Sequence, residues 1–69
     1  MTDRITGTVK WFESQKGFGF IIPDGLGNEV YVHMASIVDH RGLRDGQRVE
    51  FNIEQGSRGP EAKVVVVIG

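Results

Sequence analysis

Cysteine is absent from the 69-residue chain, which excludes both a disulfide framework and a zinc ribbon. Long apolar runs are absent too: the longest covers residues 64–68, whereas a membrane-spanning helix needs about 20 residues. The first ten residues lack the apolar core of a signal peptide. The sequence therefore predicts one small cytoplasmic domain, residues 1–69, with no cofactor.

An excess of either charge is missing as well, because eight Lys and Arg residues face nine Asp and Glu residues, for a net charge of −1. Proteins that bind nucleic acid mainly through charge are usually strongly basic. The composition therefore excludes binding through bulk charge. A polyanion would need positive residues grouped at one place, or a contact that does not depend on charge.

Helical periodicity is also missing, and short β-type runs separated by turn residues take its place. Pro23-Asp24-Gly25 is such a turn, because proline fixes φ and glycine accepts a positive φ. Residues 34–46 are predicted to form a polar loop with one helical turn near residues 35–38. The predicted strands are Ile5–Glu13, 18–22, 29–33, 47–54 and 61–68. Five short strands at this length predict an all-β fold, a small closed barrel, since closure removes exposed strand edges.

The last predicted strand ends in the apolar run 64–68. The simplest interpretation is a buried terminal strand that overhangs the barrel of a monomer. The alternative is an edge that pairs between two chains and gives a strand-exchanged dimer.

Five of the six aromatic residues fall on the first three predicted strands, where residues two apart share a face. The residues expected to face the core are Ile21, Val30 and Val32. The residues then expected to face outward are Phe18, Phe20, Tyr31 and His33. The run Lys10-Trp11-Phe12 breaks simple alternation and predicts a β-bulge or a strong twist. A lone aromatic usually packs in the core, but five on adjoining strands, interleaved with Lys and Gly, indicate a surface site.

An outward strip of aromatic rings is costly on a monomer and usually marks a binding site. Phe18 and Phe20 would stand roughly 6.6 Å apart, at about 3.3 Å per residue, which leaves room for separate flat rings. Bases of single-stranded nucleic acid supply such rings, and each stacked base contributes about 1–3 kcal/mol. Several stacks would give useful binding despite the net charge, with Lys10, Lys16 and Arg58 contacting phosphates or base edges.

Gly17 and Gly19 interrupt this aromatic strand, although glycine weakens a strand interior. Our interpretation is that they keep the binding face clear of side chains, let the chain twist, and let a ligand approach the backbone. Lys16 then supplies positive charge at the edge of that face.

Several separated motifs resemble the cold-shock domain family, in the same order and spacing. They are Lys10-Trp11-Phe12, Lys16-Gly17-Phe18-Gly19-Phe20-Ile21, Val30-Tyr31-Val32-His33 and Arg58-Gly59-Pro60-Glu61-Ala62. The likeness covers residues 6–66, nearly the whole chain. It implies a five-stranded antiparallel OB-type β-barrel that binds single-stranded RNA and DNA, often favouring pyrimidines. The roles that it implies are RNA chaperone, transcription antiterminator and translation regulator.

The resemblance also assigns site residues by position. The aromatic platform that it implies is Trp11, Phe12, Phe18, Phe20, Tyr31 and His33. The further contacts that it implies are Lys10, Lys16, Met34, Arg58 and Pro60. Three features depart from the family pattern. Met34 replaces a Phe, and Glu13 replaces an Asn. The loop 38–43 is about two residues short and lacks its usual aromatic, which His40 or Arg41 would replace in part. These departures predict weaker binding or an altered preference at one end of the site.

Other functional classes have less support. His33 and His40 have no cysteine and no carboxylate at ligand spacing, so no metal site is predicted. Ser36, Asp39 and His40 share one short loop without a nucleophile elbow, so no enzyme is predicted. A protein-interaction barrel, whose aromatic strip docks a Pro-rich peptide, is the main alternative. Lysines set among glycines favour nucleic acid over that alternative.

Overall fold

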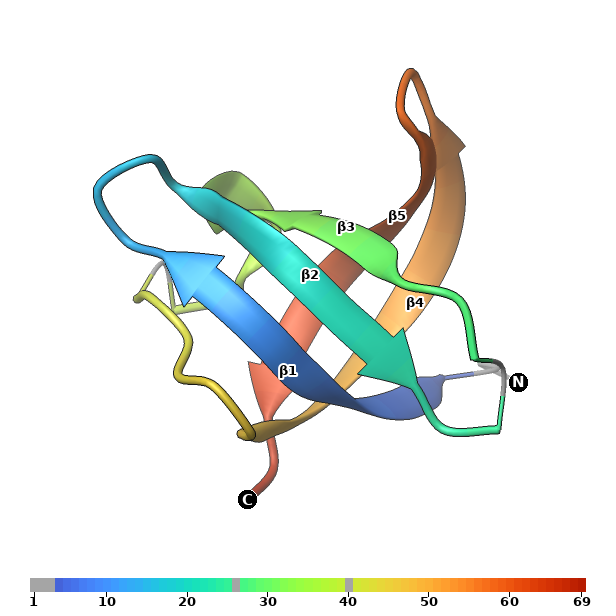
Figure 1. Ribbon diagram of the computed structural model, residues 1–69, viewed down its shortest axis with the longest axis horizontal. Coiled ribbons are helices and arrows are strands. Elements are labelled where there is room, and N and C mark those ends of the chain that lie inside the picture. Colours follow the sequence, from blue (N-terminus) through green and yellow to red (C-terminus); the bar gives the residue numbers. More distant parts are fainter. Residues whose placement is uncertain (1–3, 26, 40) are drawn as a thin grey trace.

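Five strands and one short 3-10 helix make up the computed structural model, which describes residues 4–25, 27–39 and 41–69 (Figure 1). The elements are β1 (Ile5–Glu13), β2 (Phe18–Pro23), β3 (Val30–His33), η1 (Met34–Ser36), β4 (Arg48–Gly56) and β5 (Gly59–Val67). All five predicted strands are confirmed, with ends within two residues of those expected. The helical turn begins one residue earlier than predicted. Among the described residues, no helix is both long and apolar enough to cross a bilayer.

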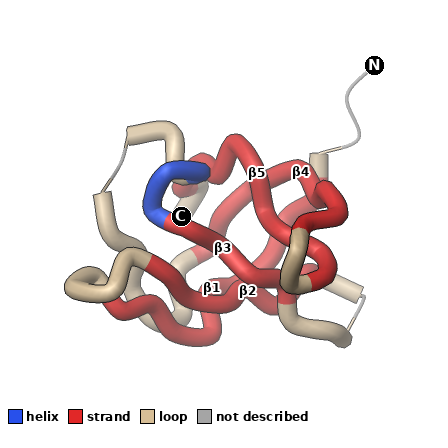
Figure 2. The backbone as a smooth tube through the Cα atoms, turned by 90° about the horizontal axis from the view of Figure 1, so that it is seen from above, coloured by secondary structure: helices blue, strands red, loops and turns tan. Residues whose placement is uncertain are grey.

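The strands close into a barrel in the order β1-β2-β3-β5-β4, and the view from above shows them curling around one interior (Figure 2). Neighbouring strands are antiparallel except β3 and β5, which run parallel where Tyr31 pairs with Glu61. The five-stranded OB-type barrel expected from the sequence is confirmed, and the seam between β3 and β5 is parallel. The reason is that the chain reverses direction twice between β3 and β5.

The core is a single apolar cluster inside the barrel. Its buried members are Val9, Ile21, Val30, Val32, Ile37, Leu43, Val49, Phe51, Ala62 and Val65. The three residues predicted to face the core from the second and third strands are all among them. Since alternate residues of a strand point to opposite faces, the buried set fixes which residues of β2 and β3 face outward.

The bulge predicted in β1 is confirmed at Lys10. Val9 pairs with Ile21 and Trp11 pairs with Phe20, so Lys10 is the extra residue between them. The bulge resets the alternation of the strand: Val9 is buried, whereas Lys10 is exposed and Trp11 is half-buried. The bulge therefore turns the indole of Trp11 toward the outer face of the barrel.

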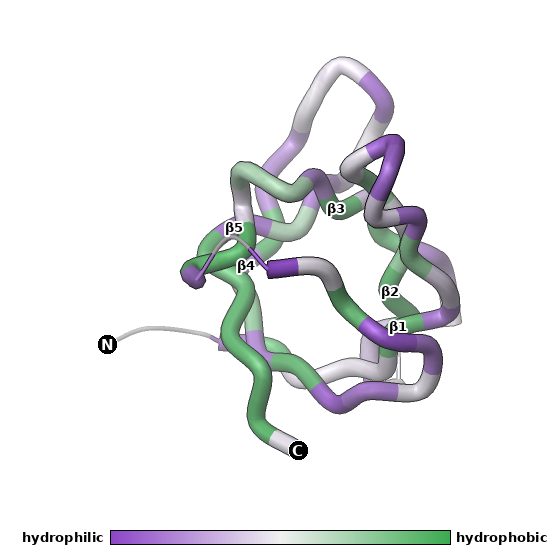
Figure 3. The backbone as a smooth tube through the Cα atoms, turned by 90° about the vertical axis from the view of Figure 1, so that its left-hand side faces the viewer, coloured by the Kyte–Doolittle hydropathy of each residue, from purple (hydrophilic) through white to green (hydrophobic). Residues whose placement is uncertain are grey.

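The end of β5 is less buried than the sequence predicted. Among residues 64–68, only Val65 is buried, while Val64 and Ile68 are each 50% exposed, and the apolar segment continues to the C-terminus (Figure 3). The prediction of a buried terminal strand is therefore wrong for all but one residue. At Val64 the physical reason is a second bulge: Val64 and Val65 both lie opposite Phe51 of β4, and Val64 has a φ of 52°.

Replacing Val64 with asparagine is expected to stabilise the protein. A β-branched residue at positive φ is a conformational outlier, and the left-handed region costs an L-residue about 1–2 kcal/mol, which Asn or Gly largely avoids. Since Val64 is half exposed, little packing is lost, and the free energy of unfolding should rise by about 1 kcal/mol. Urea unfolding of Val64→Asn and Val64→Gly measures this. Val66→Asn is the control, and an equal gain in that variant would contradict the strain at Val64.

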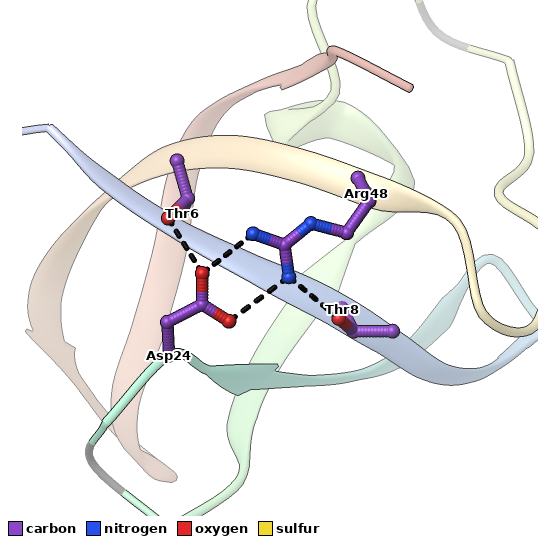
Figure 4. Close-up of polar contacts among 4 residues, drawn as sticks. All are labelled: Thr6, Thr8, Asp24 and Arg48. Atoms are coloured by element: carbon purple, nitrogen blue, oxygen red, sulfur yellow. Dashed lines mark hydrogen bonds and ion pairs between the residues drawn. The ribbon is translucent and has the colours of Figure 1, made fainter.

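A polar network ties the turn after β2 to β1 and β4. The Arg48 guanidinium donates two bonds to the Asp24 carboxylate, at 2.9 and 2.5 Å, and one to the Thr8 hydroxyl at 2.8 Å (Figure 4). The Thr6 hydroxyl also donates to Asp24, at 2.7 Å. The bonds from Arg48, with help from Thr6, lower the pKa of Asp24 from 3.8 to about 2. The same pairing raises the pKa of Arg48.

This network predicts a specific loss of stability in acid. A carboxyl whose pKa is lower in the folded state stabilises the fold fully above its unfolded pKa of 3.8, and the contribution disappears as the pH falls through about 2. Asp24→Asn should therefore lower the urea midpoint at neutral pH, by a small amount because the pair is partly exposed to solvent. The two midpoints should converge below pH 4. A difference that stays constant with pH, or an equal effect of the control Glu54→Gln, would refute this role.

Candidate functional site

Four aromatic rings meet on the outer face of β1, β2 and β3. We call Trp11, Phe18, Phe20 and Tyr31 the ring cluster. The indole of Trp11 lies edge-on to Phe18 and Phe20, with ring centroids 5.6 and 5.4 Å apart. Tyr31 stacks on Phe18 and lies edge-on to Phe20, at 5.9 Å in each case. The rings come together because Phe20 pairs with both Trp11 and Tyr31 across the sheet.

Tyr31 is the most covered ring of the cluster. It is only 8% exposed, although its strand position faces outward, because it packs beneath its aromatic neighbours. The guanidinium of Arg58 lies 4.9 Å from the centre of its ring, within the range of a cation–π contact. Tyr31 therefore supports the rings beside it and holds Arg58 at their edge.

A hollow of about 510 Å³ opens on the ring cluster, and we call it the platform hollow. Its lining residues are Lys16, Phe18, Phe20, Tyr31, His33 and Arg58. Among the described residues, Lys16 and Arg58 form no ion pair, so both cations face the hollow uncompensated. His33 pairs with Phe18 across the sheet, and its Nδ1 accepts a bond from the Ala35 N–H at 3.0 Å. The hollow thus combines apolar rings with positive charge. This combination suits a ligand that has both flat rings and negatively charged groups.

Two predicted site residues, one from the platform and one from the further contacts, lie away from the ring cluster. Phe12 and Met34 are partly buried and pack against the core. Phe12 follows Trp11 by one residue and pairs with Gly19, so its side chain takes the inner face of the sheet. Met34 begins η1, and its N–H donates to the Gly17 carbonyl at 2.8 Å. Contact of either side chain with a ligand stays a prediction.

The remaining predicted contacts also differ in position. Lys10 is held by Glu29, with 2.6 Å between Nζ and Oε2, a partner that the sequence analysis did not identify. No sequence signal pointed to it, since the two residues are brought together by the pairing of three strands. Pro60 is exposed near the start of β5 and pairs with Gln55. His40, a possible substitute in the short loop, lies outside the described residues.

The structure gives a separate reason for each of the two glycines in β2 and the turn before it. Gly17 has a φ of 78°, which glycine adopts without strain. Gly19 is buried, and a Cβ there would lie 2.2 Å from the Trp11 carbonyl oxygen and 2.7 Å from the Phe12 Cα. Gly19 therefore lets β1 approach β2 on the inner side. Keeping a binding face clear of side chains is not what its position requires.

The amino-acid sequence of this chain is similar to those of known proteins. The sequence matches the family described as the "'Cold-shock' DNA-binding domain" over residues 5–68. Cold shock-like protein CspG of Escherichia coli (strain K12) is 50% identical, over 99% of this chain and 100% of its own length. Cold shock-like protein CspA of Vibrio cholerae is 49% identical over the same shares.

A solved structure supports the fold independently. The structure described as drosophila Unr CSD456 matches with a TM-score of 0.81 at 20% identity, covering 97% of this chain and 27% of that chain. A likeness at this identity shows the fold alone, which is the OB-type barrel expected from the sequence. Together with the match over residues 5–68, these findings show that the chain belongs to the cold-shock domain family of nucleic-acid-binding proteins.

Proposed function

We propose that this protein binds single-stranded RNA and DNA by stacking bases on the ring cluster. The observation that carries the proposal is the platform hollow, whose lining combines aromatic rings with Lys16 and Arg58, two cations that form no ion pair within the described part of the chain. Stacking supplies about 1–3 kcal/mol per base, which resolves how a chain of net charge −1 can bind a polyanion. The family likeness adds a preference for pyrimidines to the proposal. A monomer is the simpler state, and a strand-exchanged dimer formed through residues 64–68 is the alternative.

The physiological role in this proposal is that of an RNA chaperone. A protein that binds unpaired strands but not duplexes opens hairpins by mass action, because each bound strand is removed from the folding equilibrium of the RNA. No fuel or catalytic group is needed, so the strand can be released again. Transcription antitermination and translation regulation are consequences of the same activity on particular hairpins.

Fluorescence of Trp11 tests the proposal, since the indole belongs to the ring cluster and is the only tryptophan. Titration with oligo-dT, oligo-U and oligo-A at low and high salt should quench the signal, most strongly for the pyrimidine strands. The affinity should fall only slowly with salt, because few phosphates are contacted. Absence of quenching in a folded sample, together with binding of a Pro-rich peptide, would instead favour the protein-interaction barrel.

A further inference from the structure

One cation beside the ring cluster already has a carboxylate as its partner. Lys10 Nζ lies 2.6 Å from Oε2 of Glu29, so the ammonium both donates a hydrogen bond and forms an ion pair. The two side chains are 46% and 41% exposed, so the pair is open to solvent and can exchange partners. Lys16 and Arg58, by contrast, form no ion pair with any described residue.

The pair crosses the outer face of β2 at one end of the ring cluster. β2 lies between β1 and β3 in the sheet (Figure 1). Lys10 is the bulged residue of β1, opposite the step from Phe20 to Ile21. Glu29 directly precedes Val30, which pairs with Ile21 from the other side. The two side chains therefore meet over β2 next to Phe20, and they close this end of the cluster with a pair of net charge zero.

A phosphate of a bound strand has to compete with this carboxylate for Lys10. Carboxylate and phosphate oxygens are both anionic acceptors, and an ammonium on its flexible stem binds either of them as a point charge. Displacing Glu29 also leaves an uncompensated negative charge close to the strand, which repels it. The carboxylate thus opposes binding twice, first by occupying the cation and then by repelling the strand once it is displaced.

We propose that Glu29 is an internal competitor of the nucleic acid, which masks Lys10 and keeps the affinity of the interface below what its cations would allow. The proposal rests on the proposed function, since the same strand is the ligand. It makes the charge of the interface asymmetric: free cations line the platform hollow, whereas the Phe20 end is neutral. A protein that must release its strand without fuel gains from such a limit, because lower affinity means faster dissociation.

Removing the carboxylate tests the proposal. In Glu29→Gln the side chain keeps its shape and loses its charge, so Lys10 becomes available to a phosphate. Binding of a labelled oligo-dT is measured by fluorescence anisotropy over a range of salt. Affinity at low salt should rise about threefold, the size of one exposed ion pair. The slope of log K against log salt should steepen by about 0.7, the value for one phosphate contact with a single strand.

A double-mutant cycle separates masking from simple repulsion. With Lys10→Gln present, Glu29→Gln should raise the affinity no more than Glu13→Gln does, because no cation is left to unmask. Glu13 is the matched control, since it is exposed, pairs with Phe18 at the opposite end of the cluster, and forms no ion pair within the described residues. The effect of Glu13→Gln should not depend on Lys10.

Three results would each overturn the masking of Lys10. They are an equal gain from Glu29→Gln with and without Lys10→Gln, which would mean repulsion alone, no gain at all, and a loss of affinity. The thermal midpoint of Glu29→Gln should change little, because the pair is exposed. In all three cases the unmodified protein still binds the strand, so the proposed function stands. If the unmodified protein binds no strand, the proposed function fails and the inference fails with it.

Discussion

Replacing both Phe18 and Phe20 with alanine is expected to lower the affinity for a short oligo-dT by about a hundredfold, and each single change by about tenfold. The reason is that the rings line the platform hollow side by side, and each can stack a separate base. Loss of one ring removes one stack at about 1–3 kcal/mol. Fluorescence anisotropy of a labelled strand measures the change without depending on the signal of Trp11.

The control for this experiment is Ile22→Ala. Ile22 lies on the same face of β2, is 39% exposed, and does not line the platform hollow, so its loss should leave the affinity unchanged. Circular dichroism and the thermal midpoint establish that each variant is folded. Phe18→Leu keeps apolar bulk without a flat ring and separates stacking from packing. Unchanged affinity in a folded Phe18→Ala/Phe20→Ala variant would reject the stacking mechanism.

Much of the fold could be predicted from the sequence because β2 and β3 alternate cleanly. Ile21, Val30 and Val32 could be assigned to the core by their spacing alone, and this placed Phe18 and Phe20 outside. The bulge at Lys10 could be predicted too. Lys10, Trp11 and Phe12 follow one another, and this run does not fit the regular alternation of inward and outward side chains along a strand. These inferences need only the period of a strand, which local sequence contains.

What the sequence could not predict depends on contacts between distant strands. Lys10 is paired with Glu29 because the β1–β2 and β2–β3 registers bring them together. Arg48 contacts Asp24 because β4 pairs with β1 where the barrel closes, although the two residues are 24 positions apart in the sequence. The positive φ of Val64 was equally hidden, because a valine run otherwise indicates a regular strand. A count of charged residues in the sequence therefore does not show which positive side chains are engaged in ion pairs and which remain available to a ligand.

The position of Phe12 illustrates the same limit within the site. A bulge changes which neighbours share a face, and its exact place decides whether Trp11 or Phe12 joins the ring cluster. The sequence indicated a bulge but not its register. Register came from the pairing of Val9 with Ile21 and Trp11 with Phe20.

Replacing Gly19 with alanine is expected to destabilise the protein by about 3 kcal/mol, the upper end of typical overpacking costs. The added Cβ would meet backbone atoms of β1, which cannot move aside as a flexible side chain can. A domain of this length has a total stability on the order of 3–10 kcal/mol, so the variant should be largely unfolded under mild urea. Circular dichroism during urea titration measures this.

Gly25→Ala is the matched control, since a Cβ there meets nothing within 4 Å and only the positive φ of 77° opposes it. Its cost should be about 1 kcal/mol. A Gly19→Ala protein as stable as this control, yet deficient in oligonucleotide binding, would mean that Gly19 serves the ligand after all. A large loss of stability, with normal affinity in the fraction that stays folded, would instead assign Gly19 to the contact between β1 and β2. That contact positions Trp11, so the glycine would then act on the site only through the register of the sheet.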